Sequence, residues 1–348
     1  MTAEASRQRK MKKLVKILLL SVVVLVIILG AAVSLTVGWR PFLGPKTRPL
    51  TARKFESTPQ RLARGSYLAT AVSGCSFCHS EHDWSQKTTP ILPGREAAGE
   101  LLPFRPLPGR VVAPNLTPDP QTGAGNWTDD QLARAIREGI GHDGRALFPI
   151  MPYEKLRVMS DEDLASVIVY LRSLPPVHHE LPTTEIIFPV KYLIRNAPEP
   201  LTTAVASPDP SDRIAWGKFI ATIAGCGDCH TPNDGHGQPI PGMSFAGGFY
   251  LAENEQRAAS ANLTPDATGI SYYDETVFLK TMRTGYVGAR QLSPVMPYAF
   301  YANMSDDDLK AIFAYLGTVK PVKHRVDNSL PVTYCKLCRQ WHGAGNQN

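Results

Sequence analysis

The sequence reads GCSFCH at residues 74–79 and GCGDCH at residues 225–230. Four further pairs of matching segments follow these two motifs in the same order. They are residues 115–119 with 262–266, 137–139 with 283–285, 149–153 with 294–298, and 159–164 with 304–309. Accidental similarity would not keep this order, so the sequence predicts two copies of one structural unit.

Helix signals recur at matching places in the two copies. Ser160 and Ser305 are each followed by three acidic residues and then by apolar residues at helical spacing, which is typical of a capped, amphipathic helix. Thr128 with Gln131 forms a capping-box pattern for a middle helix that should stop at Gly139. Shorter helices are expected before the two cysteine motifs, at residues 61–72 and 214–223.

Both cysteine motifs have the spacing C-x-x-C-H, the signal of covalent haem attachment. Two thiols add to the vinyl groups of one porphyrin, and the following histidine lies next to the iron. The sequence therefore predicts two covalently bound haem c groups. The predicted attachment residues are Cys75, Cys78, Cys226 and Cys229, and the predicted iron-binding histidines are His79 and His230.

A C-x-x-C pair has three other interpretations: a thioredoxin-like redox site, a zinc site and a structural disulfide. The histidine directly after each pair argues against the redox site. The placement of each pair in its own copy argues against one shared zinc site. A disulfide between the two cysteines of a pair would close only a very small loop.

Each copy also offers a methionine as a second axial ligand. Met151 and Met296 lie close to prolines on both sides, downstream of the middle helix. Methionine with histidine is the ligand pair that raises the potential of cytochromes c. Met159 and Met304 align as well, but each precedes a helix cap and is expected to pack in the apolar interior.

Several other residues recur or stand alone without a decisive signal. Asn115, Asn262, Arg137 and Arg283 are candidates for haem propionate contacts or for turn and helix-surface roles. Tyr153 and Tyr298 are candidates for packing on porphyrin or in an ordinary core. Surface positions are expected for the histidines without a counterpart in the other copy, which are His82, His142, His178, His179, His236 and His324.

The N-terminus predicts a membrane anchor. Residues 17–39 carry no charge and are long enough to cross a bilayer as a helix. A cleaved signal peptide is the alternative, although its apolar region would be shorter. Six of the positive charges precede this run and should stay in the cytoplasm, so the remainder of the chain is expected outside. Only Glu4 opposes these six, so the rest of the chain is near neutral and offers no basic footprint for nucleic acid.

With these motifs in place, the chain resembles the cytochrome c subunits of membrane-bound alcohol and gluconate dehydrogenases, and the wider mono- and dihaem cytochrome c family. The resemblance covers residues 58–322. It implies a mainly α fold with two tandem class I cytochrome c-like domains after a single N-terminal transmembrane helix. It also implies His79 and His230 as proximal ligands.

The C-terminus departs from that family, whose dehydrogenase-linked subunits typically carry three haem domains. Cys335 and Cys338 form a third C-x-x-C pair, but Arg339 follows it and the sequence ends at Asn348. Arginine has no lone pair for iron, so no third haem is expected. A local disulfide is the favoured expectation, and a metal site that includes His342 is the alternative.

The expected organisation follows the motifs. Its segments are a cytoplasmic basic segment (1–16), an anchor (17–39), cytochrome domain 1 (55–180), a linker (181–210), cytochrome domain 2 (211–325) and a tail with a C-x-x-C pair (326–348).

The expected function is electron transfer without catalysis, on the periplasmic side of a bacterial inner membrane. The expected partners are a dehydrogenase subunit or quinol-side donor and an oxidase or soluble cytochrome. A catalytic dihaem cytochrome of the peroxidase or thiosulfate-oxidising type is the alternative. It would need one haem with a different or leaving distal ligand, and the equal methionine loops argue against that.

Overall fold

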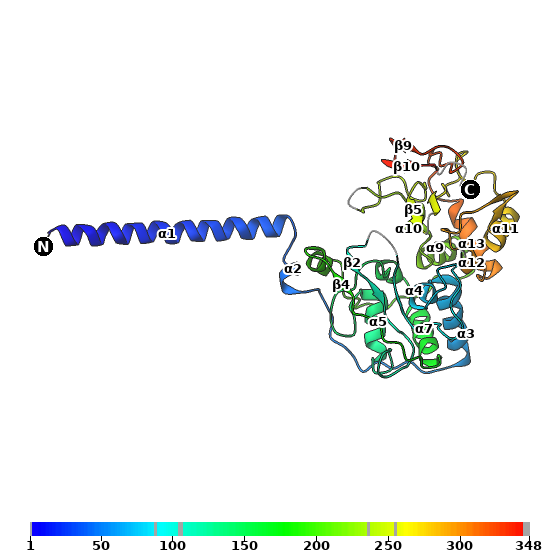
Figure 1. Ribbon diagram of the computed structural model, residues 1–348, viewed down its shortest axis with the longest axis horizontal. Helices are drawn as coiled ribbons and strands as arrows, with labels where there is room; N and C mark the ends of the chain where they lie inside the picture. Colours follow the sequence, from blue (N-terminus) through cyan, green and yellow to red (C-terminus); the bar gives the residue numbers. More distant parts are fainter. Residues whose placement is uncertain (1, 87–88, 104–106, 235–236, 254–255, 344–348) are drawn as a thin grey trace.

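The computed structural model describes residues 2–86, 89–103, 107–234, 237–253 and 256–343. The long helix α1 (Thr2–Leu35) stands away from the rest of the chain (Figure 1). Its segment Ser6–Leu35 is long and apolar enough to cross a membrane: an 18-residue stretch within it has a mean hydropathy of 3.1, and none of that stretch is buried. The helix ends short of the predicted boundary at Trp39, because the chain turns at Gly38, where φ is 69°.

The fold is mainly α, as expected, and the two copies repeat one order of helices. After the short helix α2 (Arg40–Leu43), the first copy contains α3 (Pro59–Tyr67), η1 (Leu68–Val72), α4 (Cys75–His79), α5 (Asp129–Glu138), α6 (Tyr153–Leu156) and α7 (Asp161–Ser173). The second copy contains α9 (Arg213–Ile223), α10 (Cys226–His230), α11 (Glu275–Thr284), α12 (Tyr298–Tyr301) and α13 (Asp306–Leu316).

The strands are short and pair antiparallel two by two. The pairs are β1 (Glu100–Leu101) with β3 (Val112–Ala113), β2 (Gly109–Arg110) with β4 (Glu185–Ile186), β5 (Tyr250–Glu253) with β6 (Gln256–Ala259), β7 (Tyr286–Val287) with β8 (Arg290–Gln291), and β9 (Thr333–Cys335) with β10 (Gln340–His342). They shape the loops around the helices and form no larger sheet among the described residues.

The predicted helix signals are confirmed. The Ser160 hydroxyl accepts from the backbone N–H three residues on, as does the Ser305 hydroxyl. Thr128 and Gln131 form the complete capping box of α5, and this helix ends at Gly139 with φ of 71°. Each cap satisfies N–H groups that the first helical turn leaves without partners.

A close helix crossing organises each copy. α3 packs against α7, and α9 packs against α13. A Cβ on Gly65 would lie 1.9 Å from the carbonyl oxygen of Ser166, and one on Gly217 would lie 1.9 Å from that of Ala311. Only glycine allows the two backbones to approach this closely.

The helix before the first cysteine motif contains one extra residue. Gly74 is the ninth residue after Gly65, whereas Gly225 is the eighth after Gly217. The structure absorbs this residue in η1, a single π-helical turn. Such turns insert one residue into an α-helix without breaking it, so both cysteine motifs keep the same position relative to their glycine crossings.

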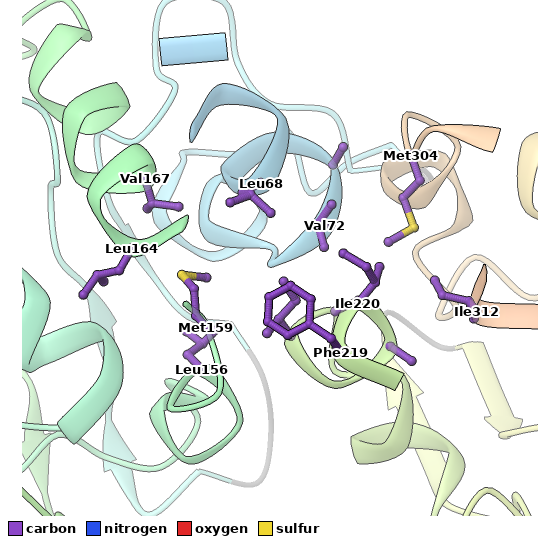
Figure 2. Packing of buried hydrophobic residues seen from close by; sticks show 14 of the residues in the cluster. Leu68, Val72, Leu156, Met159, Leu164, Val167, Phe219, Ile220, Met304 and Ile312 are labelled. Carbon is purple, nitrogen blue, oxygen red and sulfur yellow. The ribbon is translucent and has the colours of Figure 1, made fainter. Parts of the chain in front are cut away.

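One apolar core runs through both copies. Leu68 and Val72 from the first copy belong to the same buried cluster as Phe219, Ile220 and Ile312 from the second (Figure 2). The contacts between copies are reciprocal, because α6 packs on α9 while α12 packs on η1. The two copies therefore share their interior.

The segment between the copies returns to the chain just after α1. It contains β4, α8 (Val190–Leu193) and η2 (Ile194–Asn196). Arg195 donates to the carbonyl of Pro41 at 2.8 Å, and Asn196 donates to the carbonyl of Val37 at 2.9 Å. Residues 181–210 thus pack against the chain that follows α1 and also connect the copies.

Candidate haem-attachment sites

Each C-x-x-C-H motif forms one helical turn that follows a left-handed glycine. Gly74 has φ of 67° before α4, and Gly225 has φ of 70° before α10. The cysteines are half-buried, and burial raises the pKa of all four thiols, for example that of Cys226 to about 12. The two pairs therefore lie in the same local geometry.

Both motif histidines are held by a backbone carbonyl. The Nδ1 of His79 lies 2.8 Å from the oxygen of Pro114, and the Nδ1 of His230 lies 2.8 Å from that of Ala261. A carbonyl only accepts, so Nδ1 carries the proton and Nε2 keeps its lone pair for a metal. Burial lowers the pKa of both rings and favours this neutral form.

The repeated asparagines hold the loops that carry these carbonyls. The side chain of Asn115 accepts from the backbone of Thr117 and donates to the carbonyl of Val177 at 2.8 Å. Asn262 donates in the same way to the carbonyl of Val322 at 2.9 Å. The sequence left open whether these asparagines contact haem propionates or stabilise turns. In the structure they stabilise turns.

The repeated arginines hold the segment after each methionine loop. Arg137 donates to the carbonyl of Met159 at 2.9 Å and pairs with Asp161 at 2.7 Å. Arg283 bonds to the carbonyl of Ala302 and pairs with Asp306. These arginines have partners within the protein in both copies.

The two candidate methionines occupy equivalent loops. The backbone N–H of Met151 donates to Phe148 at 3.1 Å, and that of Met296 donates to Ser293 at 3.0 Å. Both side chains are half-buried and border the main core. In contrast, Met159 and Met304 are fully enclosed by apolar side chains, as expected.

A cavity joins the predicted residues of the second copy. It has a volume of about 730 Å³, and Cys226, Cys229, His230 and Met296 all line it. Its size lies in the range of about 300–1,000 Å³ that is usual for cofactor pockets. In the first copy, Cys75 and Met151 both pack against the main core. The loop of Met151 is equivalent to the loop of Met296 in sequence and in its backbone hydrogen bond.

The cysteine motif of each copy touches the helix after the methionine of the other copy. The ring of Phe77 in α4 lies 6.2 Å from that of Phe300 in α12. Asp228 in α10 lies 3.6 Å from the ammonium of Lys155 in α6. Phe77 and Asp228 hold equivalent positions in the two motifs, so the two candidate sites face one another in a pseudo-twofold arrangement.

Two histidines that the sequence placed on the surface are buried. His82 is enclosed and its Nδ1 lies 2.9 Å from a carboxylate oxygen of Glu100. His324 is 1% exposed, and His179 is its counterpart in the first copy. The sequence signal for this equivalence is a Pro-Val pair that is followed, after one further residue, by the histidine in both copies. His236 lies outside the described residues.

No protein-family model matches the chain. It is 28% identical over 75% of its length to "Alcohol dehydrogenase (quinone), cytochrome c subunit" of Gluconobacter oxydans and covers 55% of that protein. It is 27% identical over 80% of its length to "Diheme cytochrome c-type" of Cereibacter sphaeroides and covers 93% of it.

A third relative is one of the subunits of nicotinate dehydrogenase from Pseudomonas putida, which is 29% identical over 84% of the chain. The chain spans 24% of that protein and about half of the dehydrogenase cytochrome subunits. These similarities confirm the resemblance to cytochrome c subunits of dehydrogenases and to a diheme cytochrome c, and they support electron transfer by a cytochrome.

Proposed function

We propose that the chain is a membrane-anchored dihaem cytochrome c that carries electrons from a dehydrogenase or quinol-side donor to an oxidase or soluble cytochrome. The proposal assigns two class I cytochrome c domains to residues 55–180 and 211–325. The cavity that brings Cys226, Cys229, His230 and Met296 together is the observation that carries it.

The residues present fit haem c. In each copy the two cysteines of one helical turn would supply the thioether bonds. The histidine after them presents Nε2, because its Nδ1 is engaged by a backbone carbonyl. The cavity in the second copy is lined mainly by apolar side chains, as a porphyrin requires. Met296 provides the soft sulfur that favours reduced iron.

Haem supplies reversible one-electron chemistry when it is bound. His79 with Met151, and His230 with Met296, would hold the iron in the two sites. Because neither site would keep an open coordination position, a carrier is favoured over a peroxidase or a thiosulfate-oxidising enzyme. The reciprocal contacts of α4 with α12 and of α10 with α6 keep the two sites adjacent, which suits transfer between them.

The membrane location rests on α1 and on the relatives. Its basic start favours a cytoplasmic N-terminus, with both haem sites on the periplasmic side of the inner membrane. The names of several relatives connect cytochrome subunits with alcohol, fructose and gluconate dehydrogenases. A dehydrogenase subunit is therefore the proposed donor.

Haem stoichiometry tests the proposal. The intact mass of the purified protein should equal the polypeptide plus two haem groups, since thioether bonds survive denaturation. Cys75→Ala with Cys78→Ala should remove one haem and leave the second site spectroscopically intact. Cys335→Ala with Cys338→Ala is the control and should keep both. A native protein with one or three haems, or one that binds carbon monoxide at once, would refute it.

A further inference from the structure

Four side chains with metal-binding atoms gather beside the second copy. His324, Cys335, Cys338 and His342 each offer one ligand atom, and these four atoms lie within 4.8 Å of one another. The two cysteines and His342 come from the C-terminal hairpin, and His324 comes from the end of the second copy. The haem sites use none of these residues.

The hairpin is short, and its turn presents the second cysteine. β9 and β10 pair antiparallel, with Cys335 opposite Gln340. Cys338 lies in the turn between them and is fully buried against Met243 and Ala246. Arg339 takes a left-handed φ of 57°, which reverses the chain directly after this cysteine.

Contacts with the second copy hold the hairpin in place. The side-chain nitrogen of Gln340 donates to the carbonyl of Asn233 at 2.8 Å, and its oxygen accepts from the backbone of Tyr250 at 3.2 Å. Strand β10 also packs on β5 and β6. Figure 1 shows β9 and β10 at the same end of the molecule as β5. The sulfurs are therefore brought to a fixed place on the domain.

Each histidine points a ring nitrogen at one sulfur. The Nδ1 of His324 lies 2.8 Å from the carbonyl of Ala246, which leaves its Nε2 facing the sulfur of Cys335 at 3.4 Å. The Nε2 of His342 lies 3.0 Å from the sulfur of Cys338. Engagement of Nδ1 by a carbonyl is the usual way in which proteins orient a metal-binding histidine.

A glycine leaves space for both imidazole rings. A Cβ on Gly248 would lie 2.7 Å from Cε1 of His324 and 2.7 Å from Nε2 of His342. Its φ of 90° also favours glycine. Any other residue at this position would push into the group of ligand atoms.

The first copy provides an internal comparison. His179 holds the position of His324: its backbone N–H donates to Thr122, and its Nδ1 lies 2.9 Å from the carbonyl of Ala98. Its Nε2 lies 4.0 Å from a carboxylate oxygen of Glu81 instead of facing a thiol. The same histidine position thus occurs in both copies. Only in the second copy, where the C-terminal hairpin covers it, does it face three further metal-binding side chains.

We propose that His324, Cys335, Cys338 and His342 bind one zinc ion that fixes the C-terminal hairpin to the second cytochrome domain. Two sulfur and two nitrogen donors in a tetrahedron are typical of structural zinc. Bonds of about 2.3 Å to sulfur and about 2.0 Å to nitrogen place such donors roughly 3.3–3.8 Å apart. Four protein ligands leave no position for substrate, so the site is structural.

This site replaces the local disulfide expected from the sequence. Cys335 and Cys338 are not bonded to each other in the structure. A disulfide would also leave two imidazoles facing sulfurs that need no further partner. Zinc binding instead releases one proton from each thiol and uses all four groups.

Metal analysis of the full-length protein in detergent tests the proposal. One zinc per protein should copurify, with the haem iron measured separately. This zinc should remain bound after exposure to a weak chelator. X-ray absorption at the zinc edge, which haem does not disturb, should show two sulfur neighbours at about 2.3 Å and two nitrogen neighbours at about 2.0 Å.

Variants separate this site from the haem sites. His324→Ala, and Cys335→Ser with Cys338→Ser, should each lose the zinc while keeping the haem content. His179→Ala is the matched control and should keep it. Limited proteolysis should then cut the tail faster in the zinc-free variants. Native protein without zinc, or a mass two hydrogens lower from a Cys335–Cys338 disulfide, would overturn the proposal whatever the haem count.

Discussion

Four methionines fill two repeated positions, and their surroundings differ. Met159 and Met304 are 0% and 2% exposed and lie among apolar side chains of the core. Met296 instead lines the cavity with His230, and Met151 holds the equivalent loop. A fully enclosed thioether would have to repack the interior to reach a metal, so at the residue scale only the looped pair suits ligation.

Met296→His should lower the reduction potential of one haem and leave the other nearly unchanged. Imidazole is the stronger donor to oxidised iron, whereas thioether favours the reduced metal. Exchange of an axial ligand should shift the potential on the order of 0.1 V or more, measured by spectroelectrochemical titration. Met304→Leu is the control and should leave both potentials in place. An unchanged titration for Met296→His would exclude this methionine as a ligand.

The histidines mark the limit of residue-level prediction. The motif histidines could be predicted because the adjacent cysteines fix their chemistry. The equivalence of His179 and His324 was missed because the residue before each differs, His178 in one copy and Lys323 in the other. Their different roles could not be predicted at all, since the donors around His324 come from a hairpin that only the tertiary fold brings there.

At the scale of elements, the glycine crossings decide how each pair of helices packs. The sequence predicted all four helices, but it gave no sign that Gly65 and Gly217 are contact points. A glycine within a helix usually only weakens it. Here each glycine lets the backbone of a second helix pack closely against its own helix. This role becomes visible only when the partner helix is in place.

Gly217→Ala should therefore destabilise the second copy well beyond its helix propensity. The new Cβ would lie 1.9 Å from the carbonyl oxygen of Ala311, so α9 and α13 must separate. Overpacking of this kind costs about 1–3 kcal/mol or more. Gly317→Ala, whose Cβ would meet nothing closer than 3.3 Å, is the control. Thermal unfolding of both variants in detergent measures this difference. Equal melting temperatures for the two variants would contradict the close packing of α9 on α13 at Gly217.

The chain between α2 and α3 is fixed to the first copy by a buried ion pair. Arg48 forms two short bonds to Asp130, at 2.7 and 2.8 Å, and Thr51 donates its backbone N–H to the same carboxylate at 2.7 Å. Burial raises the pKa of Asp130, but these bonds outweigh it and lower the pKa to about 2. These contacts of Arg48 and Thr51 with Asp130 form a strap that ties the chain after α2 to α5.

Acid should release this strap within a defined pH window. Because the pKa of Asp130 falls from its usual 3.8 to about 2 on folding, its stabilisation of about 2 kcal/mol is present above pH 4 and is lost as pH falls to 2. Asp130→Asn should remove this stabilisation at every pH and cost about 2 kcal/mol, while Arg48 keeps its second partner Glu138 at 2.8 Å. Unfolding free energies of both proteins from pH 5 to 2 measure this.

Glu162→Gln is the control for this prediction. Glu162 pairs with Arg61 at 2.7 Å, but its side chain is 64% exposed, so the change should cost less than about 1 kcal/mol. If the stability of Asp130→Asn falls as steeply between pH 4 and 2 as that of the unaltered protein, Asp130 is not the titrating group.

At the scale of the whole molecule, the two copies form one body with reciprocal contacts. Their number and order could be predicted from the repeated motifs. Their mutual packing could not, because equivalent positions use different chemistry, two aromatic rings at Phe77 and Phe300 and an ion pair at Asp228 and Lys155. Neither pair signals a partner until the fold brings the copies together.

The position of the molecule in the membrane gives the last prediction. The basic residues in the N-terminal part of α1 should remain in the cytoplasm, and everything after Leu35 should lie outside. A reporter enzyme that is active only outside the cytoplasm should work when fused after Asn348 and fail when fused before Met1. Alkaline washing should leave the protein in the membrane, and detergent should release it.

Two outcomes would contradict this topology. An active N-terminal fusion would reverse the orientation, and release of the protein by alkali with a shortened N-terminus would identify α1 as a cleaved signal peptide. Replacement of Lys10, Lys12, Lys13 and Lys16 by Gln is the informative variant. It removes most of the positive charge that holds the N-terminus inside, so a measurable fraction of the C-terminal reporter should lose activity. The unsubstituted helix should insert in a single orientation.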